Sequence, residues 1–228
     1  MTASQGYAVA VNFASNSLAA DEVVRQIRAG GGQAITVQAD VASEREVTAM
    51  FEKIDARFGR LTALVNNAGV VDYTTRVDAI TLDRLQRMFA INVFGSFLCA
   101  RQAVLRMSTR YGGAGGSIVN VSSAASRLGS PGQYVDYAAA KGAIDSFTLG
   151  LAKEVASEGI RVNAVRPGII ETEIHASGGL PDRARESAPM VPMQRPGTAA
   201  EVAEAIMWLL SGQSSYATGA LLDIAGGR

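Results

Sequence analysis

Tyr137 and Lys141 stand four positions apart in a segment whose apolar pattern predicts a helix. At that spacing two side chains lie one turn apart on the same helix face. A free tyrosine has a pKa of about 10, whereas a proton donor or acceptor works best with a pKa near the working pH. A nearby lysine ammonium favours the phenolate and lowers that pKa. The pair therefore predicts a general acid–base group, although the same spacing is also typical of the surface of an amphipathic helix.

The position of Ser123 favours the catalytic interpretation. Ser123 follows the apolar run at 118–121, which predicts a buried strand, and the helix of Tyr137 comes next in the chain. This order places a hydroxyl donor beside the tyrosine at the carboxyl edge of a sheet, where ligands bind in α/β proteins. Tyr134 is a rival by proximity, but the residue four positions on is Ala138, so we assign the role to Tyr137.

The elements that must position these residues alternate along the chain. Helical patterns separate the apolar runs, and Ser43 with Glu46 and Thr198 with Glu201 form capping boxes at two helix starts. Strands are expected at 7–11, 34–37, 64–66, 117–121, 161–165 and 221–224, and the longest helices at 82–110 and 135–158. Strands buried on both faces and separated by helices indicate an α/β fold, with a doubly wound, Rossmann-like parallel sheet covered on both faces.

Composition sets the class of protein. The 228 residues are 48% hydrophobic and 18% charged, with zero formal net charge, which suits one globular domain over 1–228. We predict no binding to nucleic acid or to an anionic membrane, because both need a concentrated cationic face. We expect no metal site, no secretory signal and no apolar run near the ~20 residues that span a bilayer. Cys99 is expected to be a buried structural thiol, and the cytoplasm is the expected compartment.

Several segments together resemble the short-chain dehydrogenase/reductase family over essentially the whole chain. The matching segments are residues 66–69 (Asn-Asn-Ala-Gly), Asn92, residues 121–123 (Val-Ser-Ser), residues 137–141 (Tyr-Ala-Ala-Ala-Lys), residues 163–168 (Asn-Ala-Val-Arg-Pro-Gly), Thr218 with Gly219, and residues 225–227 (Ala-Gly-Gly). Each could arise by chance, but their common order and spacing are specific. The resemblance implies an enzyme that moves a hydride between a nicotinamide cofactor and an alcohol or carbonyl substrate.

The resemblance also implies roles for the matching catalytic positions. Tyr137 exchanges a proton with the substrate oxygen, and Lys141 lowers the pKa of that tyrosine and holds the nicotinamide ribose. Ser123 hydrogen-bonds the substrate oxygen and stabilises the charge that develops there. Asn92 holds a water that links Lys141 to solvent. The sole histidine, His175, is interpreted as a residue of the substrate rim rather than as a base.

Cofactor contacts carry over in the same way. By resemblance, Asp40 and Val41 meet the adenine; the other contacts are Asn67, Ala68, Gly69, Tyr137, Lys141, Pro167, Gly168, Ile170 and Thr172. Asn12 follows the first expected strand, where a carboxylate would bind the ribose 2′-hydroxyl and favour NAD. Asn12 carries no charge to repel a 2′-phosphate, so NADP is favoured and NAD remains the alternative.

The start of the chain departs from the family pattern. Members normally begin with a strand and a glycine-rich turn, whereas residues 1–6 resemble only the end of the helix that follows. The absent strand would lie between strands 7–11 and 64–66, and its loss would leave a gap of about 10 Å. Either the natural protein carries roughly thirty to forty further residues, which we favour, or the chain is a relative whose halves pack differently. In both cases we expect this 228-residue chain to bind the cofactor poorly.

Two further expectations concern the substrate and partners. The segment 171–196 is long for a connection in a compact domain and is interpreted as a substrate-covering lid. The substrate is expected to be a small alcohol or carbonyl compound, with a sugar suggested by similarity. The resemblance implies a homodimer or homotetramer, since the family usually assembles through the helices after the third and fourth strands. Both helices carry apolar residues on more than one face, which core packing explains equally well. The alternative to an enzyme is a truncated, catalytically impaired binding or scaffold module.

Overall fold

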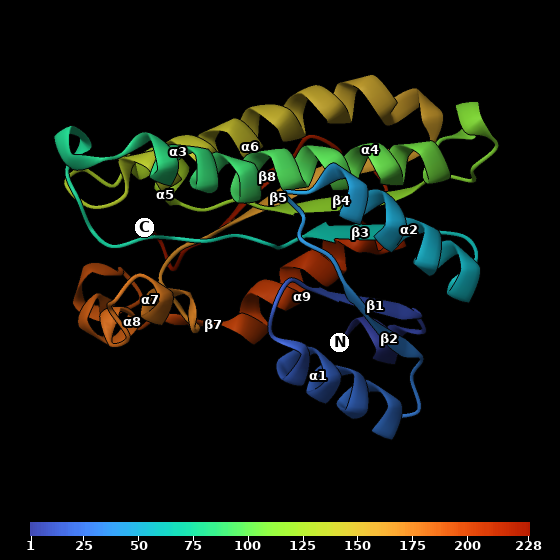
Figure 1. Ribbon diagram of the computed structural model, residues 1–228, viewed down its shortest axis with the longest axis horizontal. Coiled ribbons are helices and arrows are strands. Elements are labelled where there is room, and N and C mark those ends of the chain that lie inside the picture. Colours follow the sequence, from blue (N-terminus) through green and yellow to red (C-terminus); the bar gives the residue numbers. More distant parts are fainter.

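Parallel strands form the centre of the molecule in this computed structural model (Figure 1), which describes residues 1–228 apart from the side chains of His175 and Ser177. One sheet pairs β1 (Val9–Phe13) with β2 (Ala34–Gln38). A second sheet has the strand order β3-β4-β5-β8. Its strands are β3 (Ala63–Asn66), β4 (Gly116–Val121), β5 (Ile160–Pro167) and β8 (Leu221–Ile224), and a short parallel pair joins β6 (Ile170–Glu171) to β7 (Gly197–Thr198). The α/β class and the parallel pairing agree with the sequence prediction.

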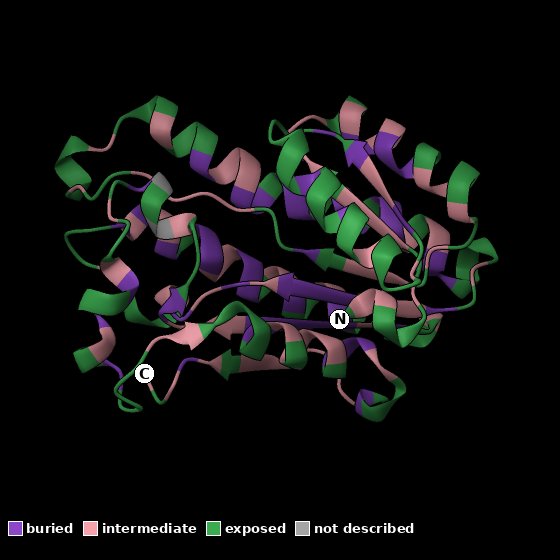
Figure 2. Cartoon of the chain, turned by 90° about the horizontal axis from the view of Figure 1, so that it is seen from below, coloured by how far each residue is buried: buried purple, intermediate pink, exposed green. Residues whose placement is uncertain are grey.

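Helices cover both faces of the larger sheet. In Figure 1, α4 and α6 lie over one face and α9 lies over the other. The helices are α1 (Ser17–Ala29), α2 (Glu44–Phe58), α3 (Leu82–Phe89), α4 (Gly95–Met107), α5 (Ala125–Leu128), α6 (Val135–Val155), α7 (Ile174–Ser177), α8 (Arg183–Glu186) and α9 (Ala199–Leu210). The buried residues concentrate in the strands and the inner helix faces (Figure 2). Phe51, Met107 and Ile118 belong to the largest buried cluster, which joins α2, α4 and β4.

Local signals explain where two of these helices begin. The Thr198 hydroxyl accepts from the Glu201 amide at 3.2 Å and the Glu201 carboxylate accepts from the Thr198 amide at 2.8 Å, so this capping box is complete. Only half of the other predicted box forms. Ser43 accepts from the Glu46 amide at 3.4 Å, but the Glu46 carboxylate accepts from the Asp40 amide instead. Glu46 thereby ties the start of α2 to the turn after β2.

Two large apolar side chains on the helices are partly exposed: Trp208 on α9 is 43% exposed and Val23 on α1 is 44% exposed. Cys99 is buried as expected, and burial raises the pKa of its thiol to about 11, so it is a structural thiol and not a nucleophile.

The segment Leu82–Met107 is long and apolar enough to cross a membrane by length and composition, contrary to the expectation that no run comes close. Half of its most apolar window is buried inside the protein. It packs against α2, α6, β3 and β4, with Ala103 and Met107 fully buried, so it is a core helix of this fold. Its continuity is broken by a π-helical turn at Ala90–Phe94, which separates α3 from α4.

The two sheets are not joined by strand pairing among the described residues, so β1 and β3 are not neighbours in one hydrogen-bonded sheet. This is the separation that the sequence pattern led us to expect between those two strands. Both the β1–β2 pair and the four-stranded sheet nevertheless keep regular parallel register, with Val9 opposite Ala34 and Ala63 opposite Ser117.

Candidate active site

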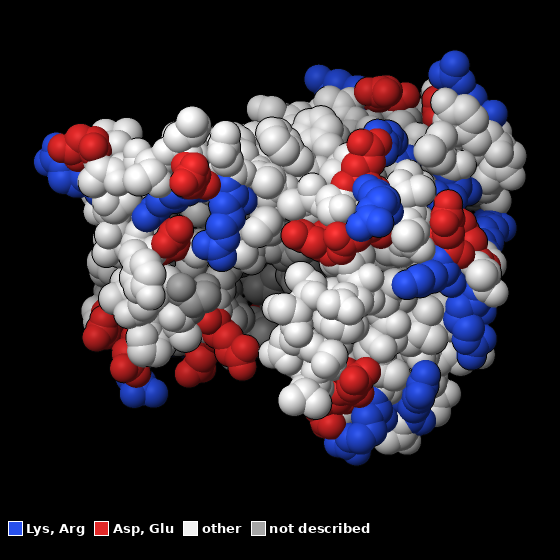
Figure 3. Space-filling view, viewed as in Figure 1, with Lys and Arg blue, Asp and Glu red and all other residues white. Residues whose placement is uncertain are grey.

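A cavity of about 1000 Å³ opens beyond the carboxyl ends of β3, β4 and β5. The space-filling view shows the molecule hollowed near its centre on the face drawn (Figure 3). Its walls include Asn67 after β3, Ser123 after β4 and Gly168 after β5, while Thr172 and Ile174 from the segment 171–196 close another side. The position agrees with the rule that ligands of parallel α/β sheets bind at this edge, and the volume is that of a small-molecule site.

Ser123, Tyr137 and Lys141 meet in this cavity. Ser123 and Tyr137 line the same part of the cavity, and the Ser123 hydroxyl is close enough to the phenol to oppose the rise of its pKa. Ser123 is oriented by the Ala125 amide, which donates to its Oγ at 3.1 Å. The Lys141 Nζ donates to the carbonyl oxygen of Val121 at 2.7 Å and lies 5.6 Å from the centre of the Tyr137 ring. The structure therefore brings together the three residues that the sequence singled out for acid–base chemistry.

The protonation of this group differs from the sequence expectation. Burial raises the pKa of Tyr137 to about 12, with the Ser123 hydroxyl opposing that rise. Burial also lowers the pKa of Lys141 to about 8, while the Asp145 carboxylate opposes that fall. The expected lowering of the tyrosine pKa is therefore wrong, because burial of the phenol outweighs the effect of the lysine. At neutral pH Tyr137 is protonated.

Asn92 lies in the π-helical turn and is completely buried. Its Oδ1 accepts from the Val70 amide at 3.2 Å, and its Nδ2 donates to the Val70 and Met88 carbonyl oxygens, each at 3.0 Å. A Cβ atom on Gly69 would lie 2.8 Å from Asn92 Oδ1 and 3.5 Å from Lys141 Nζ, so only glycine fits between them. Asn92 therefore stands behind Gly69 and fixes the chain that forms this cavity wall. Such π-turns often occur at functional sites.

The predicted cofactor residues divide into two groups. Those that line the cavity are Asn67, Gly69, Tyr137, Lys141, Pro167, Gly168, Ile170 and Thr172. Asn12, Asp40, Val41 and Ala68 are not part of its lining. The Asn12 amide donates to the Val37 and Ala39 carbonyl oxygens, which tie β1 to β2, and Val41 is packed against Gly95 of α4. Asn12, Asp40 and Val41 thus belong to the separate two-stranded part of the fold or to its junction with α4, whereas Ala68 follows β3.

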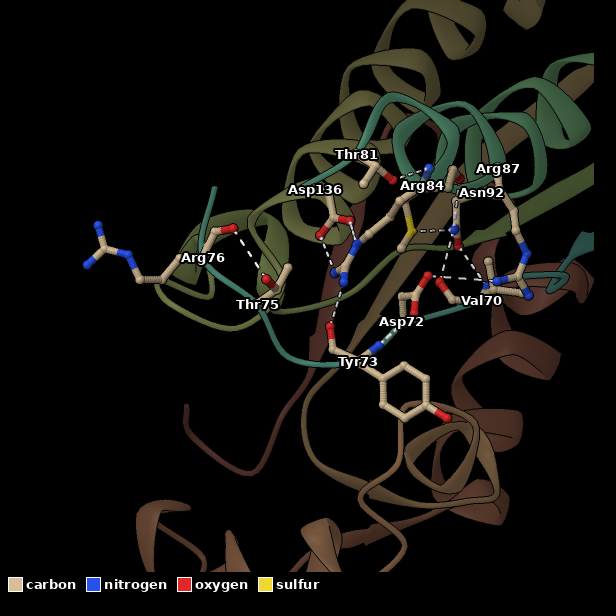
Figure 4. A network of polar contacts seen from close by, with 11 residues as sticks. Val70, Asp72, Tyr73, Thr75, Arg76, Thr81, Arg84, Arg87, Asn92 and Asp136 are labelled. Atoms are coloured by element: carbon tan, nitrogen blue, oxygen red, sulfur yellow. Dashed lines mark hydrogen bonds and ion pairs between the residues drawn. The ribbon is translucent and has the colours of Figure 1, made fainter. Parts of the chain in front are cut away.

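A buried ion pair at the start of α6 was not predicted from the sequence. The Arg84 Nε on α3 lies 2.7 Å from an oxygen of Asp136, and their side chains are 11% and 0% exposed. Asp136 directly precedes Tyr137, and Arg84 also donates to the Tyr73 carbonyl oxygen at 2.6 Å. Figure 4 shows the guanidinium between these two acceptors, in the same network as Asn92 and Val70. The network ties α3, the first turn of α6 and the chain that follows β3 into one rigid wall.

Comparison with known proteins identifies the family. The family described as enoyl-(acyl carrier protein) reductase matches residues 1–228. The chain is 55% identical to "Uncharacterized oxidoreductase YgfF" of Escherichia coli (strain K12) over 228 residues, covering 100% of this chain and 92% of that protein. The chain belongs to the short-chain dehydrogenase/reductase family. Its members are oxidoreductases that use NAD or NADP, so the protein is an NAD(P)-dependent oxidoreductase.

Solved members of this family share the fold. A gluconate 5-dehydrogenase from Burkholderia cenocepacia J2315, in complex with NADP and tartrate, superposes with a TM-score of 0.88 at 31% identity and covers 99% of this chain and 86% of that chain. A short-chain dehydrogenase/reductase mutant from Serratia marcescens gives a TM-score of 0.89 at 31% identity, with 99% and 89% covered. The Rossmann-like architecture predicted from the alternating pattern is therefore confirmed.

Proposed function

We propose that the protein interconverts an alcohol and a ketone or aldehyde, with Tyr137 as the group that exchanges the proton. The observation that carries this proposal is the meeting of the Tyr137 phenol, the Ser123 hydroxyl and the Lys141 ammonium in the wall of one cavity. A carbonyl oxygen placed between Tyr137 and Ser123 can accept from both hydroxyl groups. The two donors then stabilise negative charge as it develops on the oxygen.

The chain's own residues account for the proton. With a pKa of about 12, Tyr137 is protonated across the physiological range and can give its proton to the substrate oxygen during reduction. Lys141 has a pKa of about 8, so its ammonium is largely charged at neutral pH and stabilises the phenolate left behind. Because Lys141 also contacts the Val121 carbonyl, its position is fixed before the substrate arrives.

The residues that line the cavity fit the nicotinamide end of the cofactor. Lys141 gives one hydrogen bond, to Val121, whereas an ammonium has three N–H donors, so it can also hold a ribose hydroxyl. Asn67, Pro167 and Gly168 offer polar backbone groups along the cavity wall. When bound there, the nicotinamide supplies or accepts the hydride. NADP is favoured over NAD, because Asn12 puts no carboxylate at the end of β1 and the solved relative from Burkholderia cenocepacia is in complex with NADP.

The substrate is proposed to be a small polyhydroxylated or carbonyl compound. The related gluconate 5-dehydrogenase supports a sugar-derived substrate, and the cavity carries both apolar residues such as Val70 and polar ones such as Ser130. Residues 171–196 are proposed to act as the lid of the single domain. A Cβ atom on Gly179 of this segment would lie 2.7 Å from the Tyr73 ring, so the lid rests closely on the chain after β3.

The test measures oxidation of NADPH and NADH by a panel of ketones, aldehydes and sugars, from the fall in absorbance of the reduced cofactor. We expect oxidation of NADPH by at least one carbonyl compound, and its loss in Tyr137→Phe with cofactor binding kept. A second candidate function, a binding or scaffold module without turnover, is favoured by the separation of the β1–β2 pair from β3. It requires that Tyr137→Phe and the unaltered protein behave alike in this assay.

We also propose a homodimer or homotetramer in the cytoplasm. Phe94 and Phe97 near the start of α4 are 57% and 47% exposed, and Leu149 on α6 is 40% exposed. The Phe97 ring stacks on Phe147 at 3.8 Å between centroids, so both helices contribute to one apolar surface. Covering that surface with a second copy removes apolar area from water.

A further inference from the structure

An arginine of the lid lies in the cavity wall without a role in the proton chemistry. Arg183 begins α8 and lines the same cavity as Ser123 and Tyr137. Its side chain is held from two sides. The guanidinium carbon lies 5.0 Å from the centre of the Tyr134 ring, and Nη2 donates to the Gln133 side-chain oxygen at 2.6 Å.

These contacts orient the guanidinium without neutralising it. Tyr134 is 6% exposed and itself lines the cavity, so the ring is a fixed platform for the cation. Gln133 accepts one of the five N–H donors that an arginine carries. Among the described residues, no carboxylate lies within 4.0 Å of Arg183. Neighbouring Arg185, in contrast, faces Asp182 at 3.8 Å and is not part of the cavity lining.

Two other partly buried arginines of this protein, Arg84 and Arg166, are paired with acids. Arg84 pairs with Asp136 and Arg166 pairs with Asp145, in both cases within 3.0 Å. A half-buried guanidinium that faces a cavity and lacks such a partner retains donors for a ligand, and guanidinium matches a carboxylate through two parallel hydrogen bonds. Glu173 also lines this cavity and is exposed, so the cavity holds an acid as well as a base. A preference for an anionic substrate must therefore come from direct contact between that anion and Arg183.

We propose that Arg183, held by Tyr134 and Gln133, binds a carboxylate on the substrate, and that the substrate is therefore a hydroxy acid or keto acid. This inference deepens the proposed function and rests on it. Tyr134 lies three positions before Tyr137 in the chain, so the platform for Arg183 and the proton donor belong to one segment of the cavity wall. The carboxylate end and the reacting carbonyl of one molecule then bind to fixed points of that wall.

The test compares matched substrates. Acetoacetate, 4-oxopentanoate and 5-oxohexanoate are each compared with the hydroxyketone in which CH₂OH replaces the carboxylate. We expect Arg183→Met to lower kcat/KM by about 10- to 100-fold for the acid of the best length, because a charge-assisted hydrogen bond is lost. The neutral ketones should change by less than about threefold, since they have no carboxylate to pair with Arg183 in the wild-type protein. Arg185→Met is the matched control and should leave both series unchanged.

A second measurement separates this inference from the proposed function. Calorimetric titration of the same acids into the wild-type protein and into Arg183→Met reports binding without turnover. Weaker binding of the acids to the variant supports the carboxylate site, whether or not any carbonyl compound is reduced. Failure to reduce any carbonyl compound would count only against the proposed function. Equal effects of Arg183→Met on acids and neutral ketones, or equal binding of the acids to both proteins, would overturn the inference.

Discussion

The buried pair between Arg84 and Asp136 gives a quantitative prediction. Arg84→Met removes the cation and leaves the Asp136 carboxylate, which is 0% exposed, without its charged partner. Breaking a buried pair by removing one member costs about 3–5 kcal/mol, because the remaining charge stays desolvated. The free energy of unfolding of a folded domain is only about 5–15 kcal/mol. This single substitution should therefore remove a large part of the stability of the protein.

The assay is a double-mutant cycle measured by urea unfolding. Arg84→Met and Asp136→Leu are made singly and together, and the free energy of unfolding is extrapolated to water for each. We expect each single variant to lose about 3–5 kcal/mol and the double variant to lose much less than the sum, because two apolar side chains of similar volume can replace a buried ion pair at little cost. Losses below about 1 kcal/mol, or losses that simply add, would refute the reasoning.

The same cycle has a functional readout. Asp136 precedes Tyr137 in the first turn of α6. Arg84 also holds the backbone of Tyr73, whose ring packs against Gly179 of the segment 171–196. In the double variant, folding is restored but the hydrogen bond from Arg84 to Tyr73 is not. We therefore expect KM to rise in the double variant at a stability close to that of the wild-type protein. An unchanged KM would restrict the network to a structural role.

Three further predictions follow from burial, charge and exposed surface. Because burial lowers the pKa of Lys141 to about 8, the unfolded chain binds more protons between pH 8 and 10.5 and the stability of the protein rises across that interval. Lys141→Met should therefore raise the free energy of unfolding, measured by urea unfolding, by about 3 kcal/mol at pH 7 and by roughly half of that at pH 9.5. A gain in stability that does not depend on pH would contradict this. Asn12→Asp should lower the ratio of kcat/KM for NADPH to that for NADH by at least about tenfold, through repulsion of the 2′-phosphate, whereas an unchanged ratio would count against the NADP preference. Phe97→Glu should shift the mass measured by light scattering to that of one chain, and a wild-type protein that is already monomeric would contradict the proposed assembly.

The residues that sequence could predict are those whose geometry is local. Tyr137 and Lys141 are four positions apart on one helix, and Ser123 follows a strand, so their meeting depends only on the order of elements. Alternating apolar runs likewise predicted the parallel strands, with β8 at the expected residues and the other strand ends shifted by one or two positions. The separation of β1 from β3 was also predicted, because it depends on strand order alone.

What the sequence could not show depends on packing between distant segments. Arg84 and Asp136 are 52 positions apart, and Arg183 and Gln133 are 50 apart, so neither pair leaves a periodic signal. The raised pKa of Tyr137 comes from burial by the assembled cavity wall, which outweighs any effect of the nearby lysine. The one available hint of the ion pair was Asp136 directly before Tyr137, and this aspartate has no partner nearby in the sequence.

The central claim is that this cavity transfers a hydride to a carbonyl carbon while Tyr137 supplies the proton. The most direct measurement uses NADPH carrying deuterium at the transferable C4 position, with mass spectrometry of the alcohol formed from a carbonyl compound. We predict a product one mass unit heavier with the wild-type protein, and no product above background with Tyr137→Phe at equal cofactor occupancy. A product without deuterium, or a Tyr137→Phe variant that forms the labelled alcohol at the wild-type rate, would contradict the claim.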